Sequence, residues 1–205
     1  MTDKYGPQAE GWSERSYGDA RKYLQRRAEL IAVGMPRGAT VLDLACGDGG
    51  LGEMLARHGL RYLGADTSAE MVDAARARLG DGALVVQADL NDFVPPEQVD
   101  ATTVFRAVYY ARDHDTFFGR VAAYTRRKLV FDLNPRQYDV DDMTRRLRGA
   151  GFARVELRPF FFPQRFAMPF PLDRLAGVAE RSGPVARLAL RYRFTYVVSA
   201  WLPGS

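Results

Sequence analysis

The sequence predicts a single α/β domain in which a mostly parallel sheet is covered by helices on both faces. Two observations carry this prediction. Short apolar runs alternate with helical patterns along most of the 205 residues, and such alternation implies right-handed crossovers between parallel strands. No internal repeat, low-complexity tract or linker divides the chain, so one domain over residues 1–205 is expected.

The first half of the chain predicts a helix followed by a βαβ pattern. Asp19 is the expected N-cap of the first helix, which ends before Gly34 and Pro36. Thr67-Ser-Ala-Glu70 has the form of a capping box at a later helix start. Strands are expected at residues 41–45, 62–65, 84–88 and 99–105, and helices at residues 51–58 and 69–79.

The second half predicts a helix at 114–125, a strand at 128–133 and a helix at 142–149 that the glycines after it stop. Two β-rich runs, 153–162 and 190–201, then close the chain, and a helix at 172–181 lies between them. We interpret residues 1–37 as an N-terminal helical cap and residues 158–189 as an insertion.

Composition predicts a soluble cytoplasmic protein. The apolar fraction of 47% and the charged fraction of 26% are ordinary for a globular domain. No stretch approaches the roughly 18 consecutive apolar residues of a membrane-spanning helix, and the first residues lack the basic start and apolar run of a signal peptide. Cys46 is the single cysteine, which is compatible with a reducing compartment.

The net charge of +4 hides an asymmetry along the chain. Residues 1–144 hold 18 Lys and Arg against 22 Asp and Glu, whereas residues 145–205 hold 11 Arg against three acids. A positive terminal segment suits an acidic substrate, nucleic acid or an anionic membrane, and an Arg-rich solvated surface is the plain alternative.

The strongest functional signal is Val41-Leu-Asp-Leu-Ala-Cys-Gly-Asp-Gly-Gly50, a buried strand that runs into a glycine-rich turn and a helix. Gly47 and Gly49 can adopt backbone angles that other residues avoid, and they let a ligand approach the main chain closely. Ligands of open α/β sheets bind outside the carboxyl ends of the strands, where the strand order reverses. This turn is therefore the first candidate binding element.

Three acids fall at three successive strand ends. Asp66 follows Asp43 by 23 residues, and Asp89 follows Asp66 by 23 residues. A carboxylate at the second strand end can accept both hydroxyls of a ribose, and one at the third can accept an adenine amino hydrogen. The alternative is that Asp66 and Asp89 only cap the turns that follow them.

With these blocks the sequence closely resembles the class I S-adenosylmethionine (SAM)-dependent methyltransferases, in particular small members of the type 11 and type 25 kind. The family's first motif is an acid, a small residue and Gly-x-Gly, matched by Asp43, Ala45, Gly47 and Gly49. Ala45 replaces the glycine most often found there. The resemblance covers about residues 38–160 and implies a Rossmann-like, seven-stranded sheet whose last strand is antiparallel.

The resemblance also implies SAM as cofactor and a set of residues that bind it. The Gly47–Gly49 turn would lie against the methionine part of SAM, with Asp43 organising the loop, and Asp66 would hold the ribose hydroxyls. The full expected set is Asp43, Ala45, Gly47, Gly49, Asp66, Thr67, Met71, Asp89, Leu90, Arg106, Tyr23 and Arg27.

Two parts of this set lie outside the glycine-rich turn. Met71 would pack near the adenosine, and Asp89 with the Leu90 amide would read adenine. In the family an N-terminal helix often closes over the cofactor, and here Tyr23 and Arg27 lie at i, i+4 on such a helix. Arg27 is the candidate for the SAM carboxylate, and a solvated helix arginine is the alternative.

Two other classes of protein remain open. Gly47, Gly49 and Gly52 formally match the G-x-G-x-x-G pattern of a nicotinamide oxidoreductase, although the pattern begins late, after a strand-end acid and Cys46. A non-catalytic SAM-binding domain is the other alternative.

The segment after the fourth strand faces the acceptor in this family. His114 could take a proton from an attacking hydroxyl, or could be an exposed residue at a helix start. Tyr109 and Tyr110 could line the acceptor pocket or simply pack. No carboxylate follows the fourth strand to complete a metal site with Asp132 and Asn134, so no metal is expected.

The acceptor is expected to be a small, fairly apolar molecule: a secondary metabolite, a quinone or a lipid-like precursor. Signatures of enzymes that methylate DNA bases, glutamine or protein arginine are absent from the sequence. The aromatic segment 158–171 could roof an apolar pocket, touch a membrane surface or complete the core. The rival is an RNA methyltransferase that uses the basic terminal segment. Neither the methylated atom (oxygen, nitrogen or carbon) nor the oligomeric state follows from the sequence.

Overall fold

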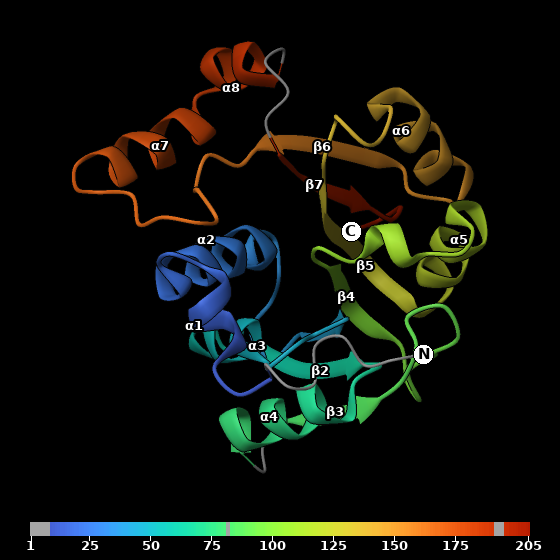
Figure 1. Cartoon of the computed structure of the whole chain (residues 1–205). Coiled ribbons are helices and arrows are strands. Elements are labelled where there is room, and N and C mark those ends of the chain that lie inside the picture. The colour runs from blue at the N-terminus through green and yellow to red at the C-terminus, as the bar shows by residue number, and fades with distance from the viewer. Residues whose placement is uncertain (1–8, 81–82, 191–194) are drawn as a thin grey trace.

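Seven strands form one sheet in the computed structural model, which describes residues 9–80, 83–190 and 195–205 (Figure 1). The strand order is β3-β2-β1-β4-β5-β7-β6. The strands are β1 (Thr40–Leu44), β2 (Arg61–Asp66), β3 (Leu84–Gln87), β4 (Val99–Val104), β5 (Thr125–Leu133), β6 (Arg154–Pro159) and β7 (Tyr196–Trp201). The chain moves outward from β1 to β3, returns to β4 beside β1, and then moves the other way. The order therefore reverses between β1 and β4.

The predicted antiparallel last strand is confirmed. β7 pairs antiparallel with both β5 and β6, and β1 to β5 pair in parallel. All six residues of β7 are buried, as expected for an apolar strand between two others. The expected strand was too long at its start, because Leu190 ends a helix and residues 191–194 lie outside the described part.

Helices cover both faces of the sheet, as predicted (Figure 1). On one face α2 (Ala20–Ala32), α3 (Gly50–Arg57) and α4 (Ala69–Leu79) pack in one apolar cluster. On the other face α5 (His114–Tyr124) and α6 (Val140–Gly149) pack in a second cluster. The alternation of side chains along β1 feeds both clusters, because Val41 belongs to the first and Leu42 to the second.

Helix caps follow the sequence with one correction. The Asp19 carboxylate accepts from the Lys22 amide at 3.0 Å and caps α2, as predicted. At α4 the cap is Ser68, one residue later than the expected capping box at Thr67. The Ser68 hydroxyl accepts from the Met71 amide at 3.3 Å. The box fails because its three-residue spacing, counted from Ser68, falls on Met71 and not on an acid.

Three further helices in the described part of the chain were not predicted: α1 (Trp12–Ser16), the 3-10 helix η3 (Val108–Tyr110) and α8 (Gly183–Leu190). Helix α7 (Leu172–Arg181) has the predicted bounds. Pro184 lies in the first turn of α8, where the N–H groups have no intrahelical acceptor and proline is tolerated. Among the described residues no helix has the length and apolarity needed to cross a bilayer.

Lys128 makes the stability of this fold depend on pH. It is fully buried in β5, where its Nζ donates to the Val33 carbonyl at 2.6 Å and lies 4.4 Å from the centre of the Trp201 ring. Burial lowers the pKa of Lys128 to about 7. The unfolded chain keeps the ordinary value of about 10.4 and therefore binds more protons above pH 7, so stability rises with pH there.

The free energy of unfolding should therefore increase by about 2 kcal/mol between about pH 7 and about pH 9. Denaturant titrations across this range measure it. In Lys128→Met the increase should disappear, since the titrating group is gone. The same rise in wild type and variant would contradict this origin.

Candidate active site

The carboxyl ends of β1 and β4 lie side by side where the strand order reverses, and the glycine-rich turn follows β1 there. Ala45 and Arg106, which come just after these two strands, are the non-glycine residues with positive φ in the described part, at 58° and 54°. This conformation costs about 1–2 kcal/mol for an L-residue, and such strain gathers at functional sites. Ala45 therefore takes the angle for which the family usually supplies glycine.

Glycines bring three segments close together at this turn. Gly49, with φ 73°, begins α3, and a Cβ there would lie 2.9 Å from the Leu79 side chain and 3.0 Å from Ala75 on α4. A Cβ on Gly47, with φ 57°, would lie 3.8 Å from the ring of Trp12 on α1. The absence of a side chain at Gly49 lets α4 pack against the turn, and Gly47 leaves room for the ring of Trp12.

Asp66 is the carboxylate that holds this turn directly. Its Oδ2 accepts from the Gly47 amide at 2.8 Å, and its Oδ1 accepts from the Ser68 amide at 3.0 Å. Asp43, which was expected to organise the turn, instead accepts from the Tyr62 hydroxyl at 3.0 Å and the Thr103 hydroxyl at 2.7 Å on the neighbouring strands. Burial raises the pKa of Asp43 to about 6.

Asp89 lies next to Asp66, as the expected row of strand-end acids requires, because the Ala88 amide donates to the Asp66 carbonyl at 2.8 Å. The Asp89 carboxylate accepts from the Asn91 amide at 2.8 Å and pairs with Arg112 at 3.2 Å. It thus also caps a turn, which was the alternative interpretation. The remaining expected residues near this row differ in exposure: Met71 and Leu90 are buried, and Thr67 is exposed.

The alternative interpretation of Arg27, a solvated helix arginine, is wrong, because its side chain is buried. Its side chain is 2% exposed and pairs with Asp132 on β5, with Nη2 at 3.2 Å from Oδ2. The same nitrogen donates to the Tyr23 hydroxyl at 2.9 Å. The guanidinium lies 4.1 Å from the centre of the Phe105 ring. Arg27 therefore belongs to a buried ion pair that joins α2 to the end of β5.

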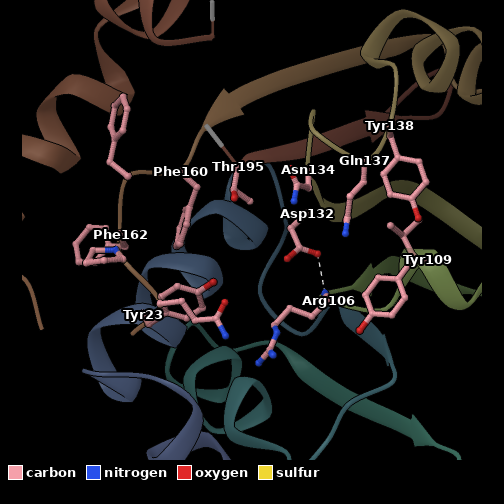
Figure 2. A pocket seen from close by; sticks show the side chains of 14 residues that line it. Tyr23, Arg106, Tyr109, Asp132, Asn134, Gln137, Tyr138, Phe160, Phe162 and Thr195 are labelled. Carbon is pink, nitrogen blue, oxygen red and sulfur yellow. Dashed lines mark hydrogen bonds between the residues drawn. The ribbon is translucent and has the colours of Figure 1, made fainter. Parts of the chain in front are cut away.

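Asp132 and Arg106 connect this ion pair to the reversal point of the sheet. Asp132 Oδ1 accepts from the Arg106 amide at 2.6 Å (Figure 2). The Arg106 guanidinium lies 5.1 Å from the Trp12 ring centre, and its Nη1 is buried with no hydrogen-bond partner in the described part of the chain. A buried arginine nitrogen with a free donor, beside a glycine-rich turn, suits a carboxylate.

A cavity of about 390 Å³ opens next to Arg106, between the end of β5 and the segment after β6 (Figure 2). Tyrosine and phenylalanine rings, three amide side chains and one carboxylate line it together. The lining residues are Tyr23, Arg106, Val108, Tyr109, Asp132, Asn134, Gln137, Tyr138, Phe160, Phe161, Phe162, Pro163, Gln164 and Thr195. Of the predicted roof, residues 160–164 line the cavity, while Phe166 and Phe170 are exposed.

The three residues expected at the acceptor do not all line the cavity. Tyr109 lines the cavity, whereas Tyr110 and His114 are not among its lining residues. The His114 ring packs against Phe118 and Tyr138, at centroid distances of 5.9 and 5.5 Å. Of these three residues, Tyr109 is therefore the one that faces this cavity.

Helix α1 lies within the predicted N-terminal cap of residues 1–37, although the sequence did not indicate a separate helix there. Ser13 on α1 donates its amide to Asp48 at 2.9 Å, and Arg78 on α4 donates to the same carboxylate at 2.8 Å. Asp48 is itself 2% exposed. These contacts hold Trp12 against Gly47. Asp48, the acid inside the glycine-rich turn, was the sequence signal for these contacts.

The structure argues against a nicotinamide oxidoreductase. One Tyr-x-x-x-Lys spacing, a pattern of some such oxidoreductases, is present at Tyr124 and Lys128. The two side chains point to opposite faces of the sheet: Tyr124 packs in the α5 and α6 cluster, and Lys128 donates to Val33 at the end of α2. Among the described residues no three His, Cys, Asp or Glu side chains gather as metal ligands.

Comparison with known proteins shows what this chain is similar to. Residues 41–128 match the methyltransferase domain family. A trans-aconitate 2-methyltransferase of Afipia carboxidovorans is 33% identical over 115 residues, which are 54% of this chain and 44% of that protein. The chain spans about half the length of the curated relatives it matches.

Solved structures share the fold over most of the chain. A Haloferax volcanii methyltransferase, solved in complex with the Trm112 methyltransferase activator, matches with a TM-score of 0.69 and 22% identity over 99% of this chain and 96% of that one. Magnesium protoporphyrin IX methyltransferase from Synechocystis, with bound SAM, matches with a TM-score of 0.60 and 18% identity over 87% of this chain and 79% of that one. Residues 41–128 therefore resemble a methyltransferase domain, and the chain has the Rossmann-like fold of SAM-dependent methyltransferases.

Proposed function

We propose that the protein transfers the methyl group of SAM to a small organic molecule bound in the cavity beside Arg106. The observation that carries this proposal is the continuity of two sites. The glycine-rich turn and the row of strand-end acids form one edge, and the 390 Å³ cavity begins at Arg106 on the same edge. A donor on the turn and an acceptor in the cavity would thus meet.

The residues at the turn fit the parts of SAM. Asp66, which ends β2 and bonds to the Gly47 and Ser68 amides, is the carboxylate at the turn that would accept from the ribose hydroxyls. The unpaired Nη1 of Arg106 fits the methionine carboxylate, a role that the buried Arg27 leaves open because Asp132 already neutralises it. Trp12 would cover the bound cofactor from α1.

SAM supplies a methyl group on a sulfonium, and its transfer is an in-line displacement. Holding the two reactants in line supplies much of the rate, so a dedicated base is optional. The protein's own task is to orient the acceptor and exclude water. Tyr109, Tyr138 and Phe160 would hold the body of the acceptor, and Asn134 and Gln137 would bind a polar group on it.

The cavity refines the expected acceptor. Its aromatic rings suit a flat, fairly apolar body, as in a quinone, a secondary metabolite or a lipid-like precursor. Its amide side chains would hydrogen-bond to a polar group on that body. The trans-aconitate relative is named for an organic acid, a small molecule with polar groups.

An RNA acceptor is the alternative to a small molecule. The two differ in how strongly their binding depends on salt concentration. Arg106 is the one cationic side chain among the lining residues that the structure describes, which favours a small molecule. The KM for the acceptor should therefore change little between low and moderate salt. Methylation assays at two salt concentrations measure this. RNA would lose affinity steeply as counterions compete for its phosphates, and such a loss would contradict the proposal.

Methyl transfer should be independent of a metal. Asp132 lines the cavity beside Asn134, but its two oxygens are taken by Arg27 and the Arg106 amide, which leaves it poorly suited to a cation. Adding a chelator to a methylation assay should leave the rate unchanged. Loss of activity that Mg²⁺ restores would overturn this expectation.

A further inference from the structure

Helix α7 carries its apolar side chains on the outside. Leu172, Leu175 and Val178 recur at three-residue spacing on one face and are 51%, 59% and 65% exposed. Amphipathic helices of globular proteins normally turn this face to the core. Figure 1 shows α7 and α8 standing outside the layered body, beyond the ends of β6 and β7.

Ion pairs to α2 fix this orientation. The Glu180 side chain is 2% exposed and accepts from Arg26 Nε at 2.8 Å and from the Phe161 amide at 2.8 Å. In the first turn of α7, Asp173 accepts from Lys22 Nζ at 2.9 Å. Because both acids of α7 are held inward, its apolar face is held outward.

The exposed apolar side chains gather on this part of the molecule. We call residues 163–190 the arm, and its seven exposed large apolar residues the arm patch. They are seven of the twelve such residues in the described part of the chain, so the exposure is concentrated. The arm patch is Phe166, Phe170, Leu172, Leu175, Val178, Val185 and Leu188.

The charges around the arm patch indicate what covers it. The arm contains four arginines and two acids, and both acids are paired with α2. Arg165 and Arg174 are exposed, and the Arg174 guanidinium lies 5.1 Å from the centre of the Phe170 ring. An outer surface that combines apolar and cationic side chains is complementary to an anionic lipid surface. A second copy of the arm would instead oppose arginine to arginine.

We propose that the arm patch docks on an anionic membrane surface. The apolar side chains of α7 would enter the boundary between headgroups and acyl chains, and Arg165 and Arg174 would pair with lipid phosphates. Residues 160–164, at the root of the arm, line the cavity, so docking would bring the cavity close to the bilayer. The proposal concerns binding and does not depend on methyl transfer.

Vesicle flotation tests it with the full chain. The probes are phosphatidylcholine vesicles with and without phosphatidylglycerol. Wild type should bind the anionic vesicles, bind the neutral ones far less, and dissociate as salt is raised. Leu175→Glu with Val178→Glu should lower the partition coefficient about tenfold or more, because two apolar groups become anions on the docking face.

Leu84→Glu with Val94→Glu is the matched control, since these two side chains are each 56% exposed at the far edge of the sheet. It should bind as wild type does. Thermal unfolding midpoints and SAM affinities of both variants should equal those of wild type. Equal vesicle binding by the arm and control variants, or none by wild type, would overturn the proposal. So would a wild-type dimer in light scattering that the arm variant alone disrupts, because a second copy would then be the occupant.

Discussion

Asp66→Ala is expected to weaken binding of S-adenosylhomocysteine, the demethylated product of SAM, by about 1.5–3 kcal/mol, or roughly tenfold to a hundredfold or more. The variant removes the proposed ribose acceptor. It also frees the Gly47 and Ser68 amides, which the carboxylate holds at 2.8 and 3.0 Å, and so loosens the glycine-rich turn. Isothermal titration calorimetry measures the change.

Asp73→Ala controls for loss of a negative charge near the site. Asp73 lies on α4, seven residues further along the chain, and its side chain is 76% exposed. This variant should bind S-adenosylhomocysteine as wild type does. Equal affinities for the Asp66 variant and wild type would show that the strand-end acid only supports the fold.

Asp132→Ala is expected to lower the free energy of unfolding by about 3–5 kcal/mol, because it leaves a buried charge without its partner. Arg27 is 2% exposed and pairs with Asp132 at 3.2 Å, and the Arg106 amide loses its acceptor as well. Urea titrations measure the loss. Arg27→Met in the Asp132→Ala background should recover much of it, since the buried charge is then gone.

The exposed pair of Glu53 and Arg57 on α3 provides the comparison. Their side chains are 42% and 49% exposed and lie 2.8 Å apart. Glu53→Ala should cost about 0.2–1 kcal/mol, as is usual for a solvent-screened pair. A similarly small cost for Asp132→Ala would mean that Arg27 reaches water in solution.

Local patterns were enough to predict the sheet and the row of acids. A strand that ends in an acid places that acid at the carboxyl edge wherever the helices pack, so Asp43, Asp66 and Asp89 could be placed from their positions in the strands. Which carboxylate holds the turn could not be predicted. That depends on the path of the turn, in which Ala45 has φ 58° and aims the Gly47 amide at Asp66.

Contacts between residues far apart in the chain could not be predicted from the sequence. Arg27 and Asp132 are 105 residues apart, and neither local sequence indicates a buried pair. The orientation of helix α7 could not be predicted either. Its bounds follow from its periodicity, but periodicity defines two faces without saying which one is buried. The partners Lys22 and Arg26, more than 150 residues away, decide that its acidic face turns inward.

The glycine-rich turn after β1 is proposed to bind the methyl donor. Calorimetric titration of the wild-type protein with S-adenosylhomocysteine, and separately with NAD, tests it most directly. We expect saturable one-to-one binding of S-adenosylhomocysteine and no heat of binding with NAD. Binding of NAD without S-adenosylhomocysteine, or binding of neither, would contradict it.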